Sequence, residues 1–212
     1  MRHRLLGPRD YRRMRWRNGR GWTTEIAKHP AAAARGQFAW RASIADVTHD
    51  GAFSQFPGAA RTLVLLSGAG MQLERASGLL HLRAPFDAVG FDGAEALSCT
   101  LVDGPVRVFN LMLHRATMQG GVAILRDADA DLPPAQFTIC HAAVDACECR
   151  LPDGREVVVD QGHTLVVESA GEQVAGNNAL GVRSASRRSV AIVAAISAGP
   201  APGPAIPSRP PA

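Results

Sequence analysis

The sequence of 212 residues predicts an all-β fold, and two observations carry this prediction. Short runs of β-branched and aromatic residues recur at a spacing of about ten residues, with Gly, Pro and Asp between them. Two of these runs, residues 61–66 and 106–113, are almost continuously apolar, which is typical of strands covered on both faces. The expected architecture is therefore a sandwich or a closed barrel.

The individual elements follow from local patterns. In residues 38–44 (FAWRASI), apolar side chains alternate with Arg and Ser, which predicts a strand with one buried face. The run RTLVLL at 61–66 stops before two glycines, and VRVFNLML at 106–113 follows a Gly-Pro pair, so both are bounded by turn residues. Evidence for a helix is confined to residues 118–129, where we expect one at most.

A weak internal repeat relates the two halves of the chain. Residues 78–91 align with residues 154–167 at a shift of 76, and each segment reads as strand, turn and strand. Two related barrel units would explain this repeat. We therefore predict four regions: a basic N-terminal arm (1–9), a first unit (10–120), a second unit (121–197) and a disordered Pro-rich tail (198–212).

The net charge of +4 comes from the N-terminal segment. Residues 1–20 hold eight arginines and one acid, which leaves the remainder of the chain with a net charge of −3. This basic segment is either a solvated strand face or a flexible arm, and nucleic acid is an unlikely partner. The sequence has no apolar signal region and no run of 18 apolar residues, so we expect a cytoplasmic protein that does not span a membrane.

Metal, cofactor and nucleophile signatures are missing. The seven histidines form no H-x-H or H-x-x-x-H pair, and no nucleophile elbow, Walker loop or dinucleotide fingerprint occurs. We therefore expect neither a metal nor a cofactor. Cys147 and Cys149 are two residues apart, so on a strand they share a face, and core packing is the favoured interpretation. A zinc site joining Cys140 and His141 would need an unusual geometry.

Six polar residues interrupt the apolar strands and are the candidate ligand-binding set: Thr24, Glu25, Arg41, Ser43, Arg61 and Asn110. Burial of an arginine is costly unless a partner compensates its charge. The planar guanidinium suits either a protein carboxylate such as Glu25 or the carboxylate of a ligand. Both interpretations stay open on spacing alone.

Four ordered blocks resemble the signature of the HutD/Ves family: WRNGRGWTTEI at 16–26, residues 38–73, the Pro-Phe pair at 85–86 and GPVRVFNLML at 104–113. The resemblance implies a bicupin, in which one cytoplasmic chain forms two double-stranded β-helix barrels. Members are often encoded with histidine-utilisation genes. It also implies a non-catalytic protein that binds a small carboxylate from that pathway, such as urocanate or a formylated or formiminated glutamate, and modulates histidine utilisation. The missing metal-ligand spacings make the expected binding metal-independent.

The family pattern falls on the following positions: Trp16, Asn18, Gly19, Thr24, Glu25, Trp40, Arg41, Ser43, Phe53, Ser54, Phe56, Gly58, Arg61, Asn110 and Met112. The chain departs from the pattern at Arg20, where a glycine is usual, and at Val108, where an acid is usual. We expect Arg61 and Arg41 to clamp the carboxylate, with the other four polar residues orienting it or satisfying the arginines. The expected pocket wall consists of Trp16, Trp40, Phe53 and Phe56.

Two other functions are kept as alternatives. The protein could be an enzyme that uses Glu25 or His49 as an acid–base group on a pathway carboxylate. It could also be an interaction module that acts through its basic arm or its Pro-rich tail. A homodimer is compatible with each of these functions.

Overall fold

The computed structural model describes residues 1–16, 21–32, 37–127, 129–169 and 179–199. Within these ranges the chain forms nineteen β-strands joined by turns, and no α-helix is present. The predicted all-β fold is thereby confirmed. The same described residues include no helix long and apolar enough to cross a membrane.

The strands form four sheets, two large and two small. The six-stranded sheet has the order β2 (Arg12–Arg15), β3 (Gly21–His29), β4 (Trp40–Val47), β11 (Val106–His114), β6 (Ala59–Ser67) and β9 (Ala88–Asp92). The five-stranded sheet has the order β1 (Arg2–Leu6), β17 (Thr164–Glu168), β14 (Phe137–Val144), β19 (Val190–Ala198) and β12 (Met118–Arg126).

Each small sheet has four strands. The first outer sheet has the order β5 (Gly51–Ala52), β10 (Ser98–Leu101), β7 (Met71–Arg75) and β8 (Gly78–Leu82). The second outer sheet has the order β13 (Ala130–Leu132), β18 (Leu180–Ser184), β15 (Cys147–Arg150) and β16 (Glu156–Val159).

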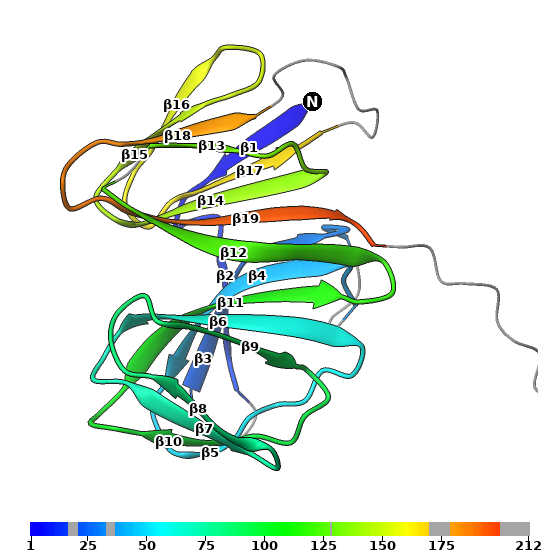
Figure 1. The fold of residues 1–212 in the computed structure, drawn as a ribbon, viewed down its shortest axis with the longest axis vertical. Helices are drawn as coiled ribbons and strands as arrows, with labels where there is room; N and C mark the ends of the chain where they lie inside the picture. The colour runs from blue at the N-terminus through cyan, green and yellow to red at the C-terminus, as the bar shows by residue number, and fades with distance from the viewer. Residues whose placement is uncertain (17–20, 33–36, 128, 170–178, 200–212) are drawn as a thin grey trace, which may run out of the picture.

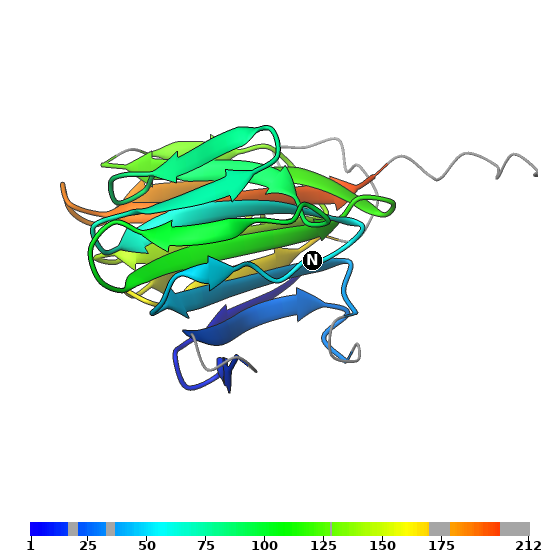
Figure 2. The same ribbon diagram turned by 90° about the horizontal axis from the view of Figure 1, so that it is seen from below.

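The four sheets stack as four layers with an apolar core between each adjacent pair (Figure 1). One core lies between the six-stranded and first outer sheets, which together we call the first sandwich. Another lies between the five-stranded and second outer sheets, the second sandwich. The third core lies between the two large sheets and joins the sandwiches. The long strands of both large sheets have roughly aligned axes, with neighbouring strands antiparallel (Figure 2).

The alternation of side chains along each strand explains how one strand serves two cores. In β4, Trp40, Ala42 and Ile44 face the central core, whereas Ala45 and Val47 face the first sandwich. Strands of the large sheets are thus covered on both faces, which accounts for the nearly continuous apolar runs in the sequence.

The predicted repeat is visible in the order of strands. A shift of 76 residues places β9 (Ala88–Asp92) on β17 (Thr164–Glu168), and it places the hairpin of β7 and β8 on that of β15 and β16. The matching strands pair alike, because β9 pairs with β6 and β17 pairs with β14.

Two segments differ from a simple interpretation of the sequence. The helix considered for residues 118–129 was wrong, because Met118–Arg126 form strand β12 and pair with β19 along their whole length. Two adjacent glycines and the β-branched Val122 and Ile124 disfavour a helix there.

At the N-terminus, Arg2–Leu6 form strand β1 at the edge of the five-stranded sheet, so the basic segment begins as a strand face. Residues 200–212 of the predicted tail lie outside the described residues.

Three polar side chains, His141, Thr164 and Tyr11, form a hydrogen-bonded series between the two large sheets. His141 on β14 is 2% exposed, and its ring stacks on Phe109 with centroids 5.8 Å apart. Its Nδ1 lies 2.9 Å from the hydroxyl of Thr164, which is 2.8 Å from the hydroxyl of Tyr11. Burial, together with the charge of Arg107, lowers the pKa of His141 to about 4.

This buried histidine makes folding stability depend on pH. In the unfolded chain His141 takes up a proton near pH 6.5, whereas in the folded chain it does so only near pH 4. The unfolded state therefore binds more protons in this window, and the free energy of unfolding should fall by about 3 kcal/mol as pH decreases through it. Urea unfolding at several pH values checks this. In His141→Gln the free energy of unfolding should depend less on pH between about 4 and 6.5, whereas His49→Gln, at an exposed histidine, should leave this dependence unchanged.

Candidate functional site

A cavity with a volume of about 750 Å³ lies in the first sandwich. It opens on the face of the six-stranded sheet that looks toward the first outer sheet. Its lining contains five basic side chains and one carboxylate: Arg12, Arg15, Lys28, Arg41, Arg61 and Glu25. Apolar walls complete it: Met14, Trp16, Phe38, Ala45, Phe53, Phe56, Leu63, Val108 and Met112. This combination of cationic groups and aromatic walls suits a small anion that also carries apolar atoms.

Strand register places the basic groups in one row across the sheet. Met112 on β11 pairs with Arg41 on β4 at one side and with Arg61 on β6 at the other. Arg41 in turn pairs with Lys28 on β3. Directly paired residues lie about 5 Å apart and share a face, so three cations from three strands point into one cavity.

A second row lies next to the first and supplies polar groups. Asn110 pairs with Ser43 at one side and Leu63 at the other, and Ser43 pairs with Glu25. Within this row Ser43 is fully buried and does not line the cavity, whereas Asn110 and Glu25 do.

A β-bulge in β3 allows two charged residues of that strand to face the cavity. The register of β3 against β4 shifts between Glu25 and Ala27. In a regular strand residues three apart face opposite sides, but the extra residue at the bulge restores the same side for Glu25 and Lys28.

Arg61 is the most deeply buried cation of the cavity. Its side chain is 5% exposed, one amino group donates to the carbonyl of Ser54 at 2.9 Å, and its Nε has no hydrogen-bond partner. The guanidinium lies 4.9–5.5 Å from the ring centres of Phe53, Phe56 and Phe91. Burial, and to a smaller degree the charge of Arg41, lowers the pKa of Arg61 to about 10, so it remains a cation at neutral pH. No acidic residue pairs with it within the described part of the chain.

Arg41 differs from Arg61 because it already has a carboxylate. Its Nε lies 2.7 Å from Oε2 of Glu25, and both side chains are largely buried. The two alternatives that spacing left open are thus divided between two residues. Arg41 forms the structural Arg–Glu pair, and Arg61 retains unused donor capacity at the cavity.

Two buried oxygens near the arginines also lack partners. Neither Oδ1 of Asn110 nor the hydroxyl of Ser43 is hydrogen-bonded. An unpaired buried polar atom costs about 1–3 kcal/mol, so such groups are usually satisfied by solvent or ligand. Because Asn110 lines the cavity beside the arginine row, a bound molecule could receive hydrogen bonds from Arg61 and donate one to Asn110.

The loop at residues 93–97 supports the aromatic wall of the cavity. The backbone amides of Phe53 and Phe56 donate to the carbonyls of Leu97 and Gly93, at 2.8 and 2.6 Å. A Cβ atom at Gly93 would lie 2.4 Å from the carbonyl oxygen of Phe56, so this close approach requires glycine.

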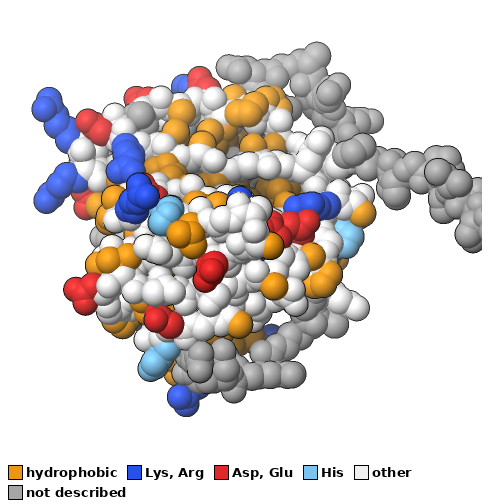
Figure 3. All heavy atoms as spheres, turned by 60° about the horizontal axis from the view of Figure 1, so that its bottom comes forward, with side chains coloured by type: hydrophobic (Ala, Val, Ile, Leu, Met, Phe, Trp, Pro, Cys, Tyr) orange, Lys and Arg blue, Asp and Glu red, His pale blue; other side chains and the backbone are white. Residues whose placement is uncertain are grey.

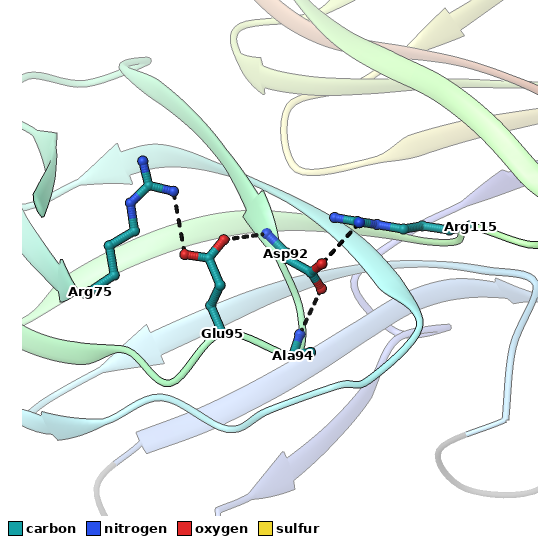
Figure 4. A network of polar contacts seen from close by, with 5 residues as sticks. All are labelled: Arg75, Asp92, Ala94, Glu95 and Arg115. Atoms are coloured by element: carbon teal, nitrogen blue, oxygen red, sulfur yellow. Dashed lines mark hydrogen bonds and ion pairs between the residues drawn. The ribbon is translucent and has the colours of Figure 1, made fainter. Parts of the chain in front are cut away.

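The supporting loop is itself held by a polar network (Figure 4). Glu95 accepts from Arg75 and from the amide of Asp92, at 3.3 and 2.9 Å. The carboxylate of Asp92 accepts from the amide of Ala94 and from Arg115, both at 2.9 Å. This network fixes the turn on which the phenylalanine wall rests.

Several predicted site residues take positions other than those expected. Trp40 is 1% exposed on the opposite face, where it packs edge-on against Phe137 in the central core, and it does not line the cavity. Thr24 pairs with Ile44, a central-core residue, so it lies on that same opposite face while Thr23 lines the cavity. The physical reason is the alternation of side chains along a strand. Trp16 does line the cavity, and its indole N–H donates to Thr23 at 2.8 Å.

The remaining candidates are also placed. His49 is exposed in a separate shallow depression and is absent from the cavity lining, so it is not brought together with Glu25. Val108, where the family pattern has an acid, lines the cavity. The cavity therefore has one carboxylate fewer than it would have with the usual acid at this position. Asn18, Gly19 and Arg20 lie outside the described residues.

Sequence reasoning missed Arg12, Arg15 and Lys28. The arginines were visible only as part of a charged segment, and Lys28 is aligned with the cavity only by the bulge. On the face of the molecule shown in Figure 3, basic and acidic side chains are interspersed, so this face presents no continuous basic patch.

A second cluster of reactive groups lies in the core of the second sandwich. The sulfurs of Cys140, Cys147 and Cys149 all lie within 4.8 Å of one another, and Cys140 and Cys147 are 3.6 Å apart. Hydrogen bonds from the other two thiols lower the pKa of Cys147, while the pKa of Cys140 is raised. As expected, Cys147 and Cys149 share one buried face of their strand.

Comparison with known families and relatives gives a consistent result. The family model HutD matches residues 8–181. The chain is similar to an uncharacterized 21.2 kDa protein in the hutC 3' region of Pseudomonas putida, with 41% identity over 119 residues, 54% of this chain and 62% of that protein. It is also similar to the protein Ves of Citrobacter koseri, with 36% identity over 51% of this chain and 56% of that protein. The matched segments thus span less than two thirds of these relatives.

Solved structures extend the similarity to nearly the whole chain. A conserved protein of unknown function from Pseudomonas aeruginosa PAO1 superimposes with a TM-score of 0.82 at 29% identity, covering 93% of this chain and all of that one. HutD from Pseudomonas fluorescens SBW25, solved in a formate condition, superimposes with a TM-score of 0.74 at 27% identity. The match covers 94% of this chain and 100% of that one. A cupin 2 conserved barrel domain protein from Leptotrichia buccalis gives 0.51 at 8% identity, covering 83% and 88%, and this likeness shows a cupin-like fold.

Proposed function

Since the chain belongs to the HutD family, we propose that it binds a small carboxylate in the cavity of the first sandwich and thereby modulates histidine utilisation in the cytoplasm. In this proposal each sandwich is one barrel of a bicupin, and binding requires no metal. The observation that carries the proposal is Arg61, a buried cation that lines the cavity, has no acidic partner among the described residues and has an Nε without a hydrogen-bond partner.

The ligand is argued from the cavity. A carboxylate accepts hydrogen bonds from a planar guanidinium in a bidentate arrangement, which would use the free donors of Arg61. The cavity volume of about 750 Å³ lies in the range of small-molecule sites. Asn110 Oδ1 favours a ligand that also has an N–H or O–H donor. Amino acids and their imidazole or formimino derivatives combine both features.

The comparisons support the proposal at the level of names and conditions. The P. putida relative is encoded in the hutC 3' region, and HutD of P. fluorescens was solved in a formate condition. Formate is the smallest carboxylate, and its charged group would fit the same guanidinium.

Binding is favoured over catalysis by the positions of the two candidate acid–base groups. Glu25 is already engaged by Arg41, whose Nε lies 2.7 Å from its carboxylate, and His49 lies outside the cavity. Nothing in the lining places a general acid and a general base on opposite sides of one bound molecule.

Thermal unfolding in the presence of a ligand panel tests the proposed function. The panel contains histidine, urocanate, formiminoglutamate, formylglutamate, glutamate and formate, each paired with its carboxamide where one exists. A carboxylate at 100 times its Kd should stabilise the folded protein by about 2.7 kcal/mol, a rise in Tm of roughly 5–10 °C. A carboxamide should give no shift. Equal shifts for acid and amide, or no shift with any acid, would contradict the proposal.

Glu25→Gln separates binding from catalysis. Glu25 competes with a ligand carboxylate for Arg41, so its neutralisation should strengthen carboxylate binding by roughly threefold to tenfold, in line with about 1 kcal/mol of charge interaction. Isothermal titration calorimetry measures this. If purified protein consumes a panel compound and Glu25→Gln abolishes that turnover, the enzyme alternative replaces the binding proposal.

A further inference from the structure

The thiol cluster of the second sandwich is formed by two strands from different sheets. Cys140 lies on β14 of the five-stranded sheet, and Cys147 and Cys149 lie on β15 of the second outer sheet. All three are at most 2% exposed and point into the same core. Cys99, the fourth cysteine, is buried in the first sandwich and belongs to a different core.

The spacing of the three sulfurs fits a single metal ion. A metal–sulfur distance of about 2.3 Å places three sulfurs of a trigonal site about 4 Å apart. The sulfurs here all lie within 4.8 Å of one another, and the pair from Cys140 and Cys147 is separated by 3.6 Å. Three donors therefore already surround one point, and only small side-chain adjustments are needed for all of them to ligate.

The surroundings select the kind of metal. Among the described residues, no further His, Cys, Asp or Glu side chain joins the three sulfurs, and the surrounding core is apolar and includes Leu132, Leu151 and Val159. Structural zinc is almost always four-coordinate, whereas soft thiolate ligands also select Cu(I).

We propose that Cys140, Cys147 and Cys149 form a three-coordinate binding site for one Cu(I) ion. Each thiol that ligates as a thiolate releases its proton to solvent, and no electron is transferred. Because the three cysteines are at most 2% exposed, metal entry requires local opening of the second sandwich. The site stabilises the second sandwich by joining its two sheets, and it is independent of the carboxylate cavity.

Anaerobic titration of the reduced full-length protein with Cu(I), buffered by a competing chelator, tests this proposal. We expect one copper per chain, and X-ray absorption should show three sulfur neighbours. Cys147→Ser and Cys149→Ser should lower the affinity by more than the roughly 10- to 100-fold that loss of an outer-shell partner costs. Cys99→Ser is the matched control and should bind one copper with unchanged affinity, because Cys99 lies in the other sandwich.

Three results would overturn the site. The first is binding of less than one copper per chain by the folded wild-type protein. The second is a loss of binding in Cys99→Ser equal to that in the other serine variants. The third is a copper ion with nitrogen or oxygen neighbours. If the serine variants do not fold, as judged by circular dichroism, the sulfur count of the wild-type and Cys99→Ser proteins decides.

Discussion

Replacing Arg61 with methionine is expected to weaken carboxylate binding by roughly 100-fold. The guanidinium is the most buried cation of the cavity and has unused donors, so its hydrogen bonds to a ligand form away from competing water. Loss of one partner of a buried charge pair costs about 3 kcal/mol, which corresponds to this factor. Calorimetric titration of the strongest binder in the panel measures the change.

The same variant should be more stable than the wild type when no ligand is present. A buried guanidinium without an acid destabilises the folded state, as its lowered pKa shows, and methionine fills similar space with an apolar chain. A gain of about 1 kcal/mol would raise Tm by roughly 2–4 °C. Arg12→Met at the exposed rim is the matched control and should change affinity by less than about threefold. If both variants bind equally well, Arg61 is not the anchor.

Phe137→Ala is expected to destabilise the protein by about 3–5 kcal/mol, the usual cost of removing a buried phenylalanine ring. Phe137 belongs to the second sandwich, but its ring packs against Trp40 and His29 of the first, with centroids 5.4 and 4.6 Å away. The cavity left by the substitution therefore lies in the core that joins the two sandwiches.

Urea unfolding followed by two probes checks this prediction. The three tryptophans, Trp16, Trp22 and Trp40, all lie in the first half of the chain, so fluorescence reports the first sandwich, whereas circular dichroism reports all strands. Both transitions should move to lower urea together. A fluorescence midpoint that stays in place would mean that the sandwiches unfold independently. Leu79→Ala, at a 52% exposed leucine, should change stability by less than about 0.5 kcal/mol.

The fold class was predictable from sequence because strand periodicity is a local property. The apolar runs at 61–66 and 106–113 are central strands covered on both sides, as their composition indicates. The helix prediction over residues 118–129 was wrong because the glycines and isolated apolar residues at 118–126 show no clear periodicity. Their state is set by pairing with β19, more than sixty residues later in the chain.

The site was predictable in part. Arg61, Arg41, Glu25 and Asn110 stand out because charged or amide groups interrupt apolar strands, and the structure brings them to one cavity. Thr24 and Trp40 could not be separated from this set, because the face of a residue depends on the parity of its strand. The bulge at residues 25–27 changes that parity for Lys28, and no local pattern reveals it.

The pairing of β1 with β17 has a consequence for synthesis of the protein. Leu6 pairs with Thr164, so the two partners leave the ribosome more than 150 residues apart. At about 5–20 residues per second, β1 waits roughly ten to thirty seconds before its neighbour emerges. Charged side chains on an edge strand disfavour pairing with other chains, and Arg2 and Arg4 are exposed on β1. We therefore expect the N-terminal charge to limit aggregation during synthesis as well as at the sheet edge of the folded protein.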